Sequence, residues 1–193
     1  MKNNVIACLV MLMAAVGASA QDSSRLFELK SGVITRESIV EGQRLETKLY
    51  FDDYGRRFAE YVTLHCYIDG ELKEVLVNGL FCSNGHLYSI EYAKKAKTEL
   101  TEPPVNFLNI TEDMKKTYRI KKIGKEEMCG KPCDVYSLRG KGIMSQSKTT
   151  AWVWKGITMK KDVRVLNIYY EETANDIQEN VHVDPSVFIV PEF

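Results

Sequence analysis

Apolar and polar residues alternate along much of this chain. In the stretch QRLETKLYFD, residues 43–52, one set of positions carries Leu45, Thr47, Leu49 and Phe51, and the positions between them carry Glu46, Lys48, Tyr50 and Asp52. A period of two residues is typical of a strand that is buried on one face, because successive side chains point to opposite sides of a sheet. We therefore predict a half-buried strand at 43–52.

Similar patterns predict a succession of strands separated by short turns. Asp69-Gly70 and Asn84-Gly85 are typical of two-residue hairpin turns, because these residue types tolerate a positive φ. The predicted strands are 25–40, 43–52, 56–68, 71–78, 118–127, 133–138, 149–156, 163–170 and 180–183. Sequential strands joined by tight turns form an antiparallel meander, so we predict one mainly β (α+β) domain.

The middle of the chain favours a short helix. Pro103-Pro104 interrupts regular structure, and the following stretch EDMKKTY, residues 112–118, has acidic residues first and lysines after them. This order complements the helix dipole, and either Asn109 or Thr111 can cap the N-terminus. We predict a helix within 109–118, a second helical segment around 92–100 and an apolar, strand-like tail at 184–193.

Residues 1–20 have the pattern of a cleavable secretory signal peptide. Lys2 precedes an apolar run that starts at Val5, and Ala18-Ser19-Ala20 supplies small residues before a cleavage point at Gln21. The apolar run is shorter than the roughly 20 residues that span a bilayer. We therefore predict an exported protein of the periplasm or cell envelope, with a mature domain at 21–193 that is peripheral to a membrane at most.

The charge balance and the absence of familiar motifs argue against several functions. Lys plus Arg number 26 and Asp plus Glu also number 26, so no net charge attracts nucleic acid. The sequence has no nucleophile elbow, phosphate-binding glycine loop or dinucleotide fingerprint, and its three histidines are isolated. Charged pairs such as Glu126-Glu127, Glu171-Glu172 and Lys160-Lys161 are interpreted as solvated surface. We predict a monomer that is not an enzyme and has no cofactor, metal or nucleic-acid partner.

The stretch CGKPC, residues 129–133, has two interpretations that depend on the hairpin register. If Gly130-Lys131-Pro132 is a three-residue loop, Cys129 and Cys133 face each other at a separation that a disulfide allows. If Cys129-Gly130 is a two-residue turn, the two cysteines are too far apart to bond. The sequence leaves both open, so Cys129 and Cys133 are a candidate disulfide.

The other two cysteines of the predicted mature chain are expected to remain apart. With Asp69-Gly70 as a two-residue turn, Cys66 lies opposite Lys73, and Cys82 lies too far along the sheet to reach it. Because bridged cysteines need Cα atoms within about 7 Å, we predict no bond between Cys66 and Cys82.

Trp152 and Trp154 share one face of the strand predicted at 149–156. Two large aromatic side chains on one face either pack in the core or line a pocket for an apolar ligand. We therefore name both tryptophans as candidate ligand-lining residues, with core packing as the alternative.

The chain from 118 onward also resembles a known group of proteins. The motifs are GKEEMCGKPCDVY, AWVWKGITMKK and the final DPSVFIVPEF, supported by LYFDDYG and PVNFLNITEDMKKTY earlier in the chain. They resemble an exported Bacteroidetes-type protein family of unknown function that is related to the periplasmic lipoprotein carriers, the LolA-like superfamily. The resemblance implies a strongly curved antiparallel sheet or incomplete barrel, with one or two short helices on its concave side and an apolar cavity suited to acyl chains. No functional residue of the carriers maps onto a position of this sequence.

Two functions of different classes remain. The first is a non-enzymatic envelope protein that binds a lipid, a lipoprotein acyl chain or another apolar ligand in the concave face of the sheet. The second is a structural or protein-interaction module of the cell envelope, which meets its partner through exposed strand edges or through a tyrosine-rich face, Tyr61, Tyr67, Tyr88 and Tyr92.

Overall fold

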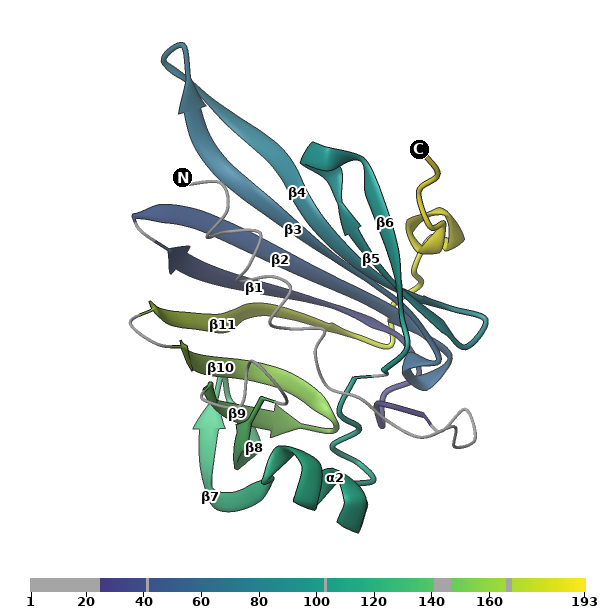
Figure 1. Cartoon of the computed structure of the whole chain (residues 1–193), viewed down its shortest axis with the longest axis vertical. Helices are drawn as coiled ribbons and strands as arrows, with labels where there is room; N and C mark the ends of the chain where they lie inside the picture. Colours follow the sequence, from purple (N-terminus) through teal and green to yellow (C-terminus); the bar gives the residue numbers. More distant parts are fainter. Residues whose placement is uncertain (1–24, 41, 103, 141–146, 166–167) are drawn as a thin grey trace.

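The computed structural model describes residues 25–40, 42–102, 104–140, 147–165 and 168–193. These residues build one antiparallel sheet of 11 strands, which curves strongly and is not closed into a barrel (Figure 1). The mainly β fold class is therefore confirmed. The predicted signal peptide at 1–20 lies outside the described residues. Within them, no helix is both long and apolar enough to cross a bilayer.

The strands fall into two groups along the chain. The first group is β1 Gly32–Val40, β2 Gln43–Asp52, β3 Arg57–Ile68, β4 Glu71–Ser83, β5 His86–Glu91 and β6 Ala96–Leu100. The second group is β7 Lys121–Met128, β8 Lys131–Arg139, β9 Lys148–Trp154, β10 Ile157–Val165 and β11 Ile168–Glu179. Helix α2, Glu112–Tyr118, lies between the groups, and short 3₁₀ turns occupy Asp53–Gly55 (η1), Tyr92–Lys94 (η2) and Pro185–Phe188 (η4).

The first and the last strands of the chain pair in the middle of the sheet. The strand order is β6-β5-β4-β3-β2-β1-β11-β10-β9-β8-β7, so β6 and β7 form the two outer edges. The connection between β6 and β7 must therefore pass from one edge of the curved sheet to the other. This connection includes α2 and brings residues 104–107 over the concave side of the sheet.

Two-residue turns with left-handed backbone set the register of several hairpins. Asp69-Gly70 and Asn84-Gly85 form the predicted turns, with φ of +54° and +82° in the first and +53° and +81° in the second. Lys155-Gly156 joins β9 to β10 in the same way, with φ of +51° and +83°. Positive φ at both positions matches the twist of antiparallel strands, which explains the choice of Asn, Asp and Gly in the two predicted turns.

Several predicted elements differ from the structure. Residues 96–100, predicted as part of a helix, instead pair with β5 as the edge strand β6. The predicted strand at 180–183 is wrong, because the last strand ends at Glu179 and pairs with β1. The tail at 184–193 contains the turn η4 and no strand. The helix is confirmed, and its N-terminal cap is Thr111, whose hydroxyl accepts a hydrogen bond from the Met114 amide at 3.2 Å.

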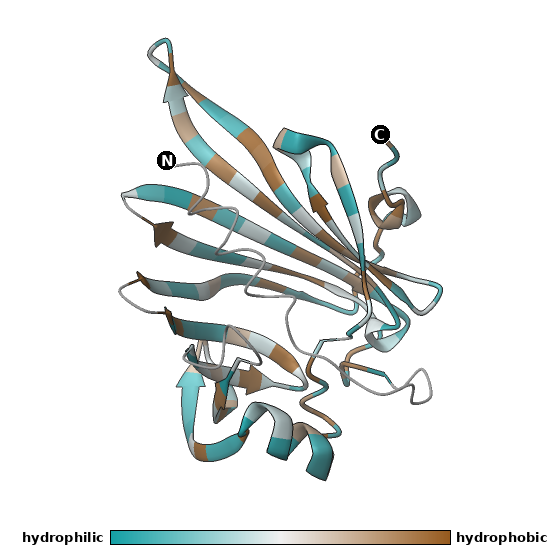
Figure 2. Cartoon of the chain, viewed as in Figure 1, coloured by the Kyte–Doolittle hydropathy of each residue, from teal (hydrophilic) through white to brown (hydrophobic). Residues whose placement is uncertain are grey.

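Each face of the sheet is covered by a different part of the chain. Hydropathy alternates along the strands (Figure 2), so neighbouring residues serve opposite faces. On one face, Val183 and Phe188 of the C-terminal segment pack against Ala59, Phe81 and Ile90. On the other, Tyr118 of α2 packs against Leu138 and Val153. The second face is the concave one and contains the candidate site.

Candidate functional site

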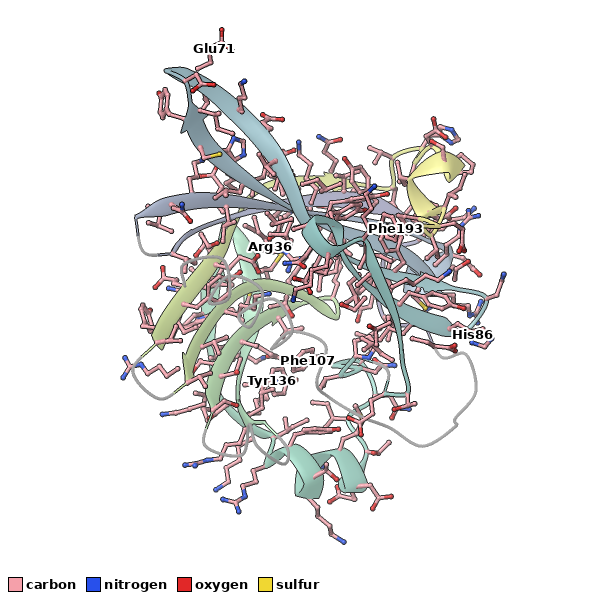
Figure 3. All side chains as sticks on the ribbon, turned by 45° about the horizontal axis from the view of Figure 1, so that its top comes forward. Arg36, Glu71, His86, Phe107, Tyr136 and Phe193 are labelled. Carbon is pink, nitrogen blue, oxygen red and sulfur yellow. The ribbon has the colours of Figure 1, made fainter. Side chains whose placement is uncertain are left out.

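The concave face holds a cavity of about 200 Å³ that draws its lining from both groups of strands. Its apolar lining is Leu26, Phe27, Leu49, Phe58, Leu80, Pro104, Val105, Phe107, Leu138, Ala151 and Val163, together with the ring of Tyr170. The exposed residue Arg139 also lines it. Phe107 and Tyr136 lie inside the curve of the sheet (Figure 3), with their ring centroids 5.1 Å apart. The sheet thus supplies the floor of an apolar site, and irregular segments supply part of its walls.

Two segments outside the sheet line the cavity. Val105 and Phe107 belong to the connection between β6 and β7, where the Asn106 side chain donates to the Arg25 carbonyl at 3.2 Å. Leu26 and Phe27 belong to the segment before β1, whose Glu28 amide donates to the Lys155 carbonyl at 3.1 Å. The Leu26 and Phe27 amides also donate to the Tyr54 carbonyl, at 2.9 and 3.0 Å, so the segment before β1 is anchored to the η1 turn.

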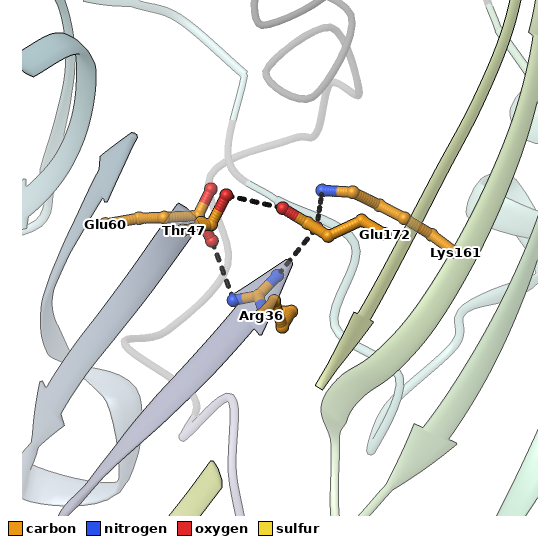
Figure 4. A network of polar contacts seen from close by, with 5 residues as sticks. All are labelled: Arg36, Thr47, Glu60, Lys161 and Glu172. Carbon is orange, nitrogen blue, oxygen red and sulfur yellow. Dashed lines mark hydrogen bonds and ion pairs between the residues drawn. The ribbon is translucent and has the colours of Figure 1, made fainter. Parts of the chain in front are cut away.

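Charged side chains form a buried network in the floor of this cavity (Figure 4). Arg36 of β1 contacts Glu60 of β3 at 2.9 Å and Glu172 of β11 at 3.4 Å. Glu172 also accepts hydrogen bonds from Lys161 at 2.7 Å and from the Thr47 hydroxyl at 2.5 Å. Arg36 is 3% exposed and Glu172 is fully buried. Buried charges of this kind are stable only when paired.

The network determines the ionisation of Glu172. Burial alone would raise the pKa of this carboxyl, but the charges of Lys161 and Arg36, with hydrogen bonds from Lys161 and Thr47, outweigh burial and lower its pKa to about 2. Glu172 is therefore ionised at neutral pH. The prediction that Glu171-Glu172 is a solvated pair is wrong for Glu172, as is the surface assignment of Lys161, whereas Glu171 is exposed.

Because the folded-state pKa of Glu172 lies below its unfolded value, the network stabilises the protein above about pH 4.5, and this stabilisation is lost as the pH falls towards 2. We expect the free energy of unfolding, measured with urea at several pH values, to drop by about 3 kcal/mol more in the wild type than in E172Q between pH 5 and pH 2. Equal slopes for the two proteins would contradict this assignment.

Trp152 and Trp154 lie in the core and outside the cavity lining. Thr149 and Ala151 of the same strand line the cavity, and both tryptophans occupy the alternate positions on the opposite face. The Trp152 indole donates to Glu126 at 2.7 Å, and the Lys131 and Lys155 ammonium groups lie 4.7 and 4.6 Å from the Trp154 ring. Both side chains are buried, at 8% and 7% exposed, in a core cluster that includes Phe51.

The CGKPC stretch forms the two-residue turn, the second of its two registers. Met128 pairs with Lys131, and Cys129 and Gly130 have φ of +52° and +69°. Cys129 and Cys133 are free thiols in the structure, and the Cys129 thiol donates to the Ala174 carbonyl at 2.8 Å. Cys66 lies opposite Lys73, as predicted, and Cys82 lies opposite Phe58.

We expect the two cysteines of this turn to differ in reactivity. Cys129 is exposed, whereas Cys133 is 2% exposed and burial raises its pKa to about 11. Since the thiolate is the reactive form, iodoacetamide at pH 8 should label Cys129 at least about tenfold faster than Cys133. Peptide mass spectrometry of the timed reaction measures both rates. Comparable labelling of the two residues, or a disulfide between them, would contradict the structure.

Three of the four tyrosines on the face predicted to bind a partner protein are partly buried in the structure. Tyr61, Tyr88 and Tyr92 pack beneath the C-terminal segment, and the Tyr61 hydroxyl donates to the Val187 carbonyl at 2.6 Å. Both outer strands carry charged residues along their exposed length, which disfavours pairing with another chain. Five of the exposed apolar residues lie together on the β3–β4 hairpin, which projects beyond its neighbours (Figure 1). They are Tyr67, Ile68, Leu72, Val75 and Leu76.

Comparisons with known proteins support the fold. Neither the protein-family models nor the curated proteins gave a match to this sequence. The structure is similar to the Pseudomonas aeruginosa MucA/MucB complex, with a TM-score of 0.51 and 11% identity, covering 88% of this chain and 58% of that chain. It is equally similar to an uncharacterized conserved protein from Thermus thermophilus, with a TM-score of 0.51 and 9% identity, covering 86% of this chain and 88% of that one.

A likeness to a putative outer membrane lipoprotein-sorting protein domain from Vibrio parahaemolyticus has a TM-score of 0.35 and carries no weight. This chain spans less than two thirds of the matched chain of the MucA/MucB complex. At identities of 9% and 11%, the first two matches show a shared fold alone.

Proposed function

We propose that this protein binds an apolar ligand, a lipid or an acyl chain, in the cavity on the concave face of the sheet, and that it does so without catalysis. The observation that carries the proposal is the cavity itself, which is lined mainly by aliphatic and aromatic side chains. An apolar cavity with a few convergent polar groups is the usual form of a small-molecule site. The resemblance of the sequence to LolA-like carriers and a predicted location in the periplasm agree with this role.

The size of the cavity limits what it holds in this conformation. Its volume of about 200 Å³ lies below the roughly 300–1,000 Å³ of typical ligand sites. A short apolar segment fits, whereas enclosing a longer acyl chain requires Val105 and Phe107 to move outward. The 104–107 segment lies outside the sheet and can move while the ladders stay intact, whereas the Leu26 and Phe27 amides both donate to the Tyr54 carbonyl, at 2.9 and 3.0 Å.

A bulky substitution on the cavity side of β9 tests this proposal, and the same substitution on the other side of the strand is its control. Thr149 lines the cavity, and Thr150 lies next to it on the opposite face of β9. We expect T149W to weaken binding of the neutral dye N-phenyl-1-naphthylamine by at least about tenfold, because the indole occupies the apolar volume. The matched variant T150W should bind like the wild type. Native mass spectrometry of the protein from its own envelope should also show a bound acyl species.

Two results would overturn the proposal. One is that the wild type neither binds the dye nor carries an acyl species after purification. The other is that T149W and T150W bind the dye equally well, which would place the bound dye outside the cavity.

A role in protein interaction is the second candidate. The β3–β4 hairpin exposes Tyr67 at 76% and Leu72 at 58%, and its tip lies far from the cavity residue Arg36 (Figure 3). The similar MucA/MucB structure is a complex of two proteins. Photo-crosslinking in the envelope from position 72, with position 99 on the β6 edge as the control, tests this role. A single protein adduct from position 72 alone would support it, and no adduct from either position would count against it.

A further inference from the structure

The β3–β4 hairpin carries an apolar stripe on its concave side. Successive side chains of a strand point to opposite faces, and Glu60 of β3 lines the cavity on the concave face. Leu64, Cys66 and Ile68 follow Glu60 at even spacing along β3, so they share its face. Val75 of β4 lies directly opposite Leu64 and belongs to the same concave stripe. The hairpin therefore extends the concave face beyond the cavity.

The concave stripe is continuous with the apolar wall of the cavity. Val163 lines the cavity and belongs to a buried cluster with Val62, against which Leu64 and Val77 pack. Four residues of extended strand carry β3 from Glu60 to Leu64, a distance of about 13 Å. An alkyl chain that leaves the cavity on this side therefore passes directly onto further apolar side chains.

Exposure of the concave stripe increases with distance from the cavity. Leu64 is half-buried, whereas Val75 is 37% and Ile68 is 41% exposed. Two charged residues on this side of the hairpin, Lys73 and Glu71, lie near its tip and pair with each other at 3.9 Å. The stripe thus exposes apolar side chains to water beside an apolar cavity, which is unfavourable unless a ligand covers them.

From this continuity we infer that the concave stripe is the outer part of the ligand site and holds the portion of an acyl chain that the cavity cannot enclose. This inference rests on the proposed ligand binding. The cavity of about 200 Å³ is smaller than typical ligand sites, so a longer chain must continue outside it unless the 104–107 segment moves. Facing side chains on paired strands lie about 5 Å apart, which suits one alkyl chain, whereas a helix of another protein is about 10 Å wide.

Cys66 provides a test in the wild-type protein, because its thiol is free and half-buried within the concave stripe. Octanol and dodecanol are compared, at concentrations that displace N-phenyl-1-naphthylamine equally, for protection of the thiols from N-ethylmaleimide. We expect dodecanol to slow the labelling of Cys66 at least about fivefold and octanol to slow it less than twofold, because only the longer chain reaches the stripe. Cys129, exposed in the β7–β8 turn, is the control and should be labelled at the same rate with either alcohol.

A pair of matched variants tests the stripe by affinity. Val75 and Leu76 are neighbours on β4 with nearly equal exposure, 37% and 36%, but Leu76 lies opposite Thr63 on the other face of the hairpin. V75N should reduce the advantage of dodecanol over octanol in displacing the dye at least about threefold, because part of the longer chain then meets an amide instead of an apolar side chain. L76N should leave this advantage unchanged.

The outcomes separate this inference from the proposed function. If both alcohols displace the dye but neither protects Cys66, or if V75N and L76N change the advantage equally, the stripe is not part of the site and ligand binding stands. Protection of Cys66 that rises with protein concentration without alcohol would place a second copy of this chain on the stripe and overturn the inference. If neither the dye nor an alcohol binds to the wild type, ligand binding itself fails. Should V75N not fold, the protection of Cys66 in the wild type decides alone.

Discussion

Replacing Arg36 by methionine is expected to lower the free energy of unfolding by about 3–5 kcal/mol. The variant removes the cation that holds Glu60 at 2.9 Å and Glu172 at 3.4 Å, and it leaves the fully buried Glu172 with Lys161 as its remaining charged partner. Breaking a buried ion pair from one side is costly, because the remaining charge is already removed from water. Urea denaturation followed by circular dichroism measures the loss.

The matched control for this variant is R44M. Arg44 pairs with Glu37 on the surface, where the two side chains are 53% and 36% exposed. Such a pair contributes at most about 1 kcal/mol, because water solvates both partners when it breaks. If R36M and R44M lose the same stability, the buried network contributes no more than a surface ion pair, and its structural role is overturned.

Replacing Gly156 by alanine is the second change with a large expected effect. Gly156 has a φ of +83°, and an added Cβ would overlap the backbone oxygen of Leu26 and approach the Leu108 Cγ to 2.9 Å. Left-handed strain costs about 1–2 kcal/mol, and forced overlap with a packed neighbour adds about 1–3 kcal/mol. We expect G156A to lose about 3 kcal/mol in urea denaturation.

The control for G156A is G70A in the β3–β4 turn. Gly70 has nearly the same backbone, with a φ of +82°, but no atom lies within 4 Å of an added Cβ. G70A should therefore lose about 1 kcal/mol from backbone strain alone. Equal losses in the two variants would show that the close approach of the Leu26 segment to the β9–β10 turn does not contribute to stability.

Strands and turns could be predicted from the sequence where their local signals agree with their tertiary environment. Alternation at 43–52 predicted β2 with its boundaries, and Asp69-Gly70 and Asn84-Gly85 predicted two hairpin registers, because these turns need positive φ. Residues 96–100 were misassigned because Ala96, Lys97, Glu99 and Leu100 favour a helix, whereas pairing with β5 imposes a strand. The pairing of β1 with β11 leaves no local trace in the sequence.

The buried network was missed for a related reason. A period of two says which residues share a face but does not say which face is buried, so Glu172 and Lys161 looked like ordinary surface charges. A usable signal was present in the strands at 43–52 and 56–68, where Thr47 and Glu60 fall in the apolar phase between Leu45, Leu49, Phe58 and Val62. Polar residues at core positions of neighbouring strands are a pattern from which a buried polar cluster can be predicted.

The pairing of the first strand with the last one has a consequence for how this chain acquires its structure. Gly32 lies opposite Glu179, so the centre of the sheet joins residues almost 150 positions apart and cannot form until nearly the whole polypeptide is available. High contact order of this kind slows folding, because a long loop must close before the contacts that stabilise it exist. A chain passed N-terminus first through a narrow secretion channel could pair β1 to β6 early, but the centre of its sheet would stay open until β11 emerged. Truncation before residue 168 would leave two half-sheets with unprotected central edges.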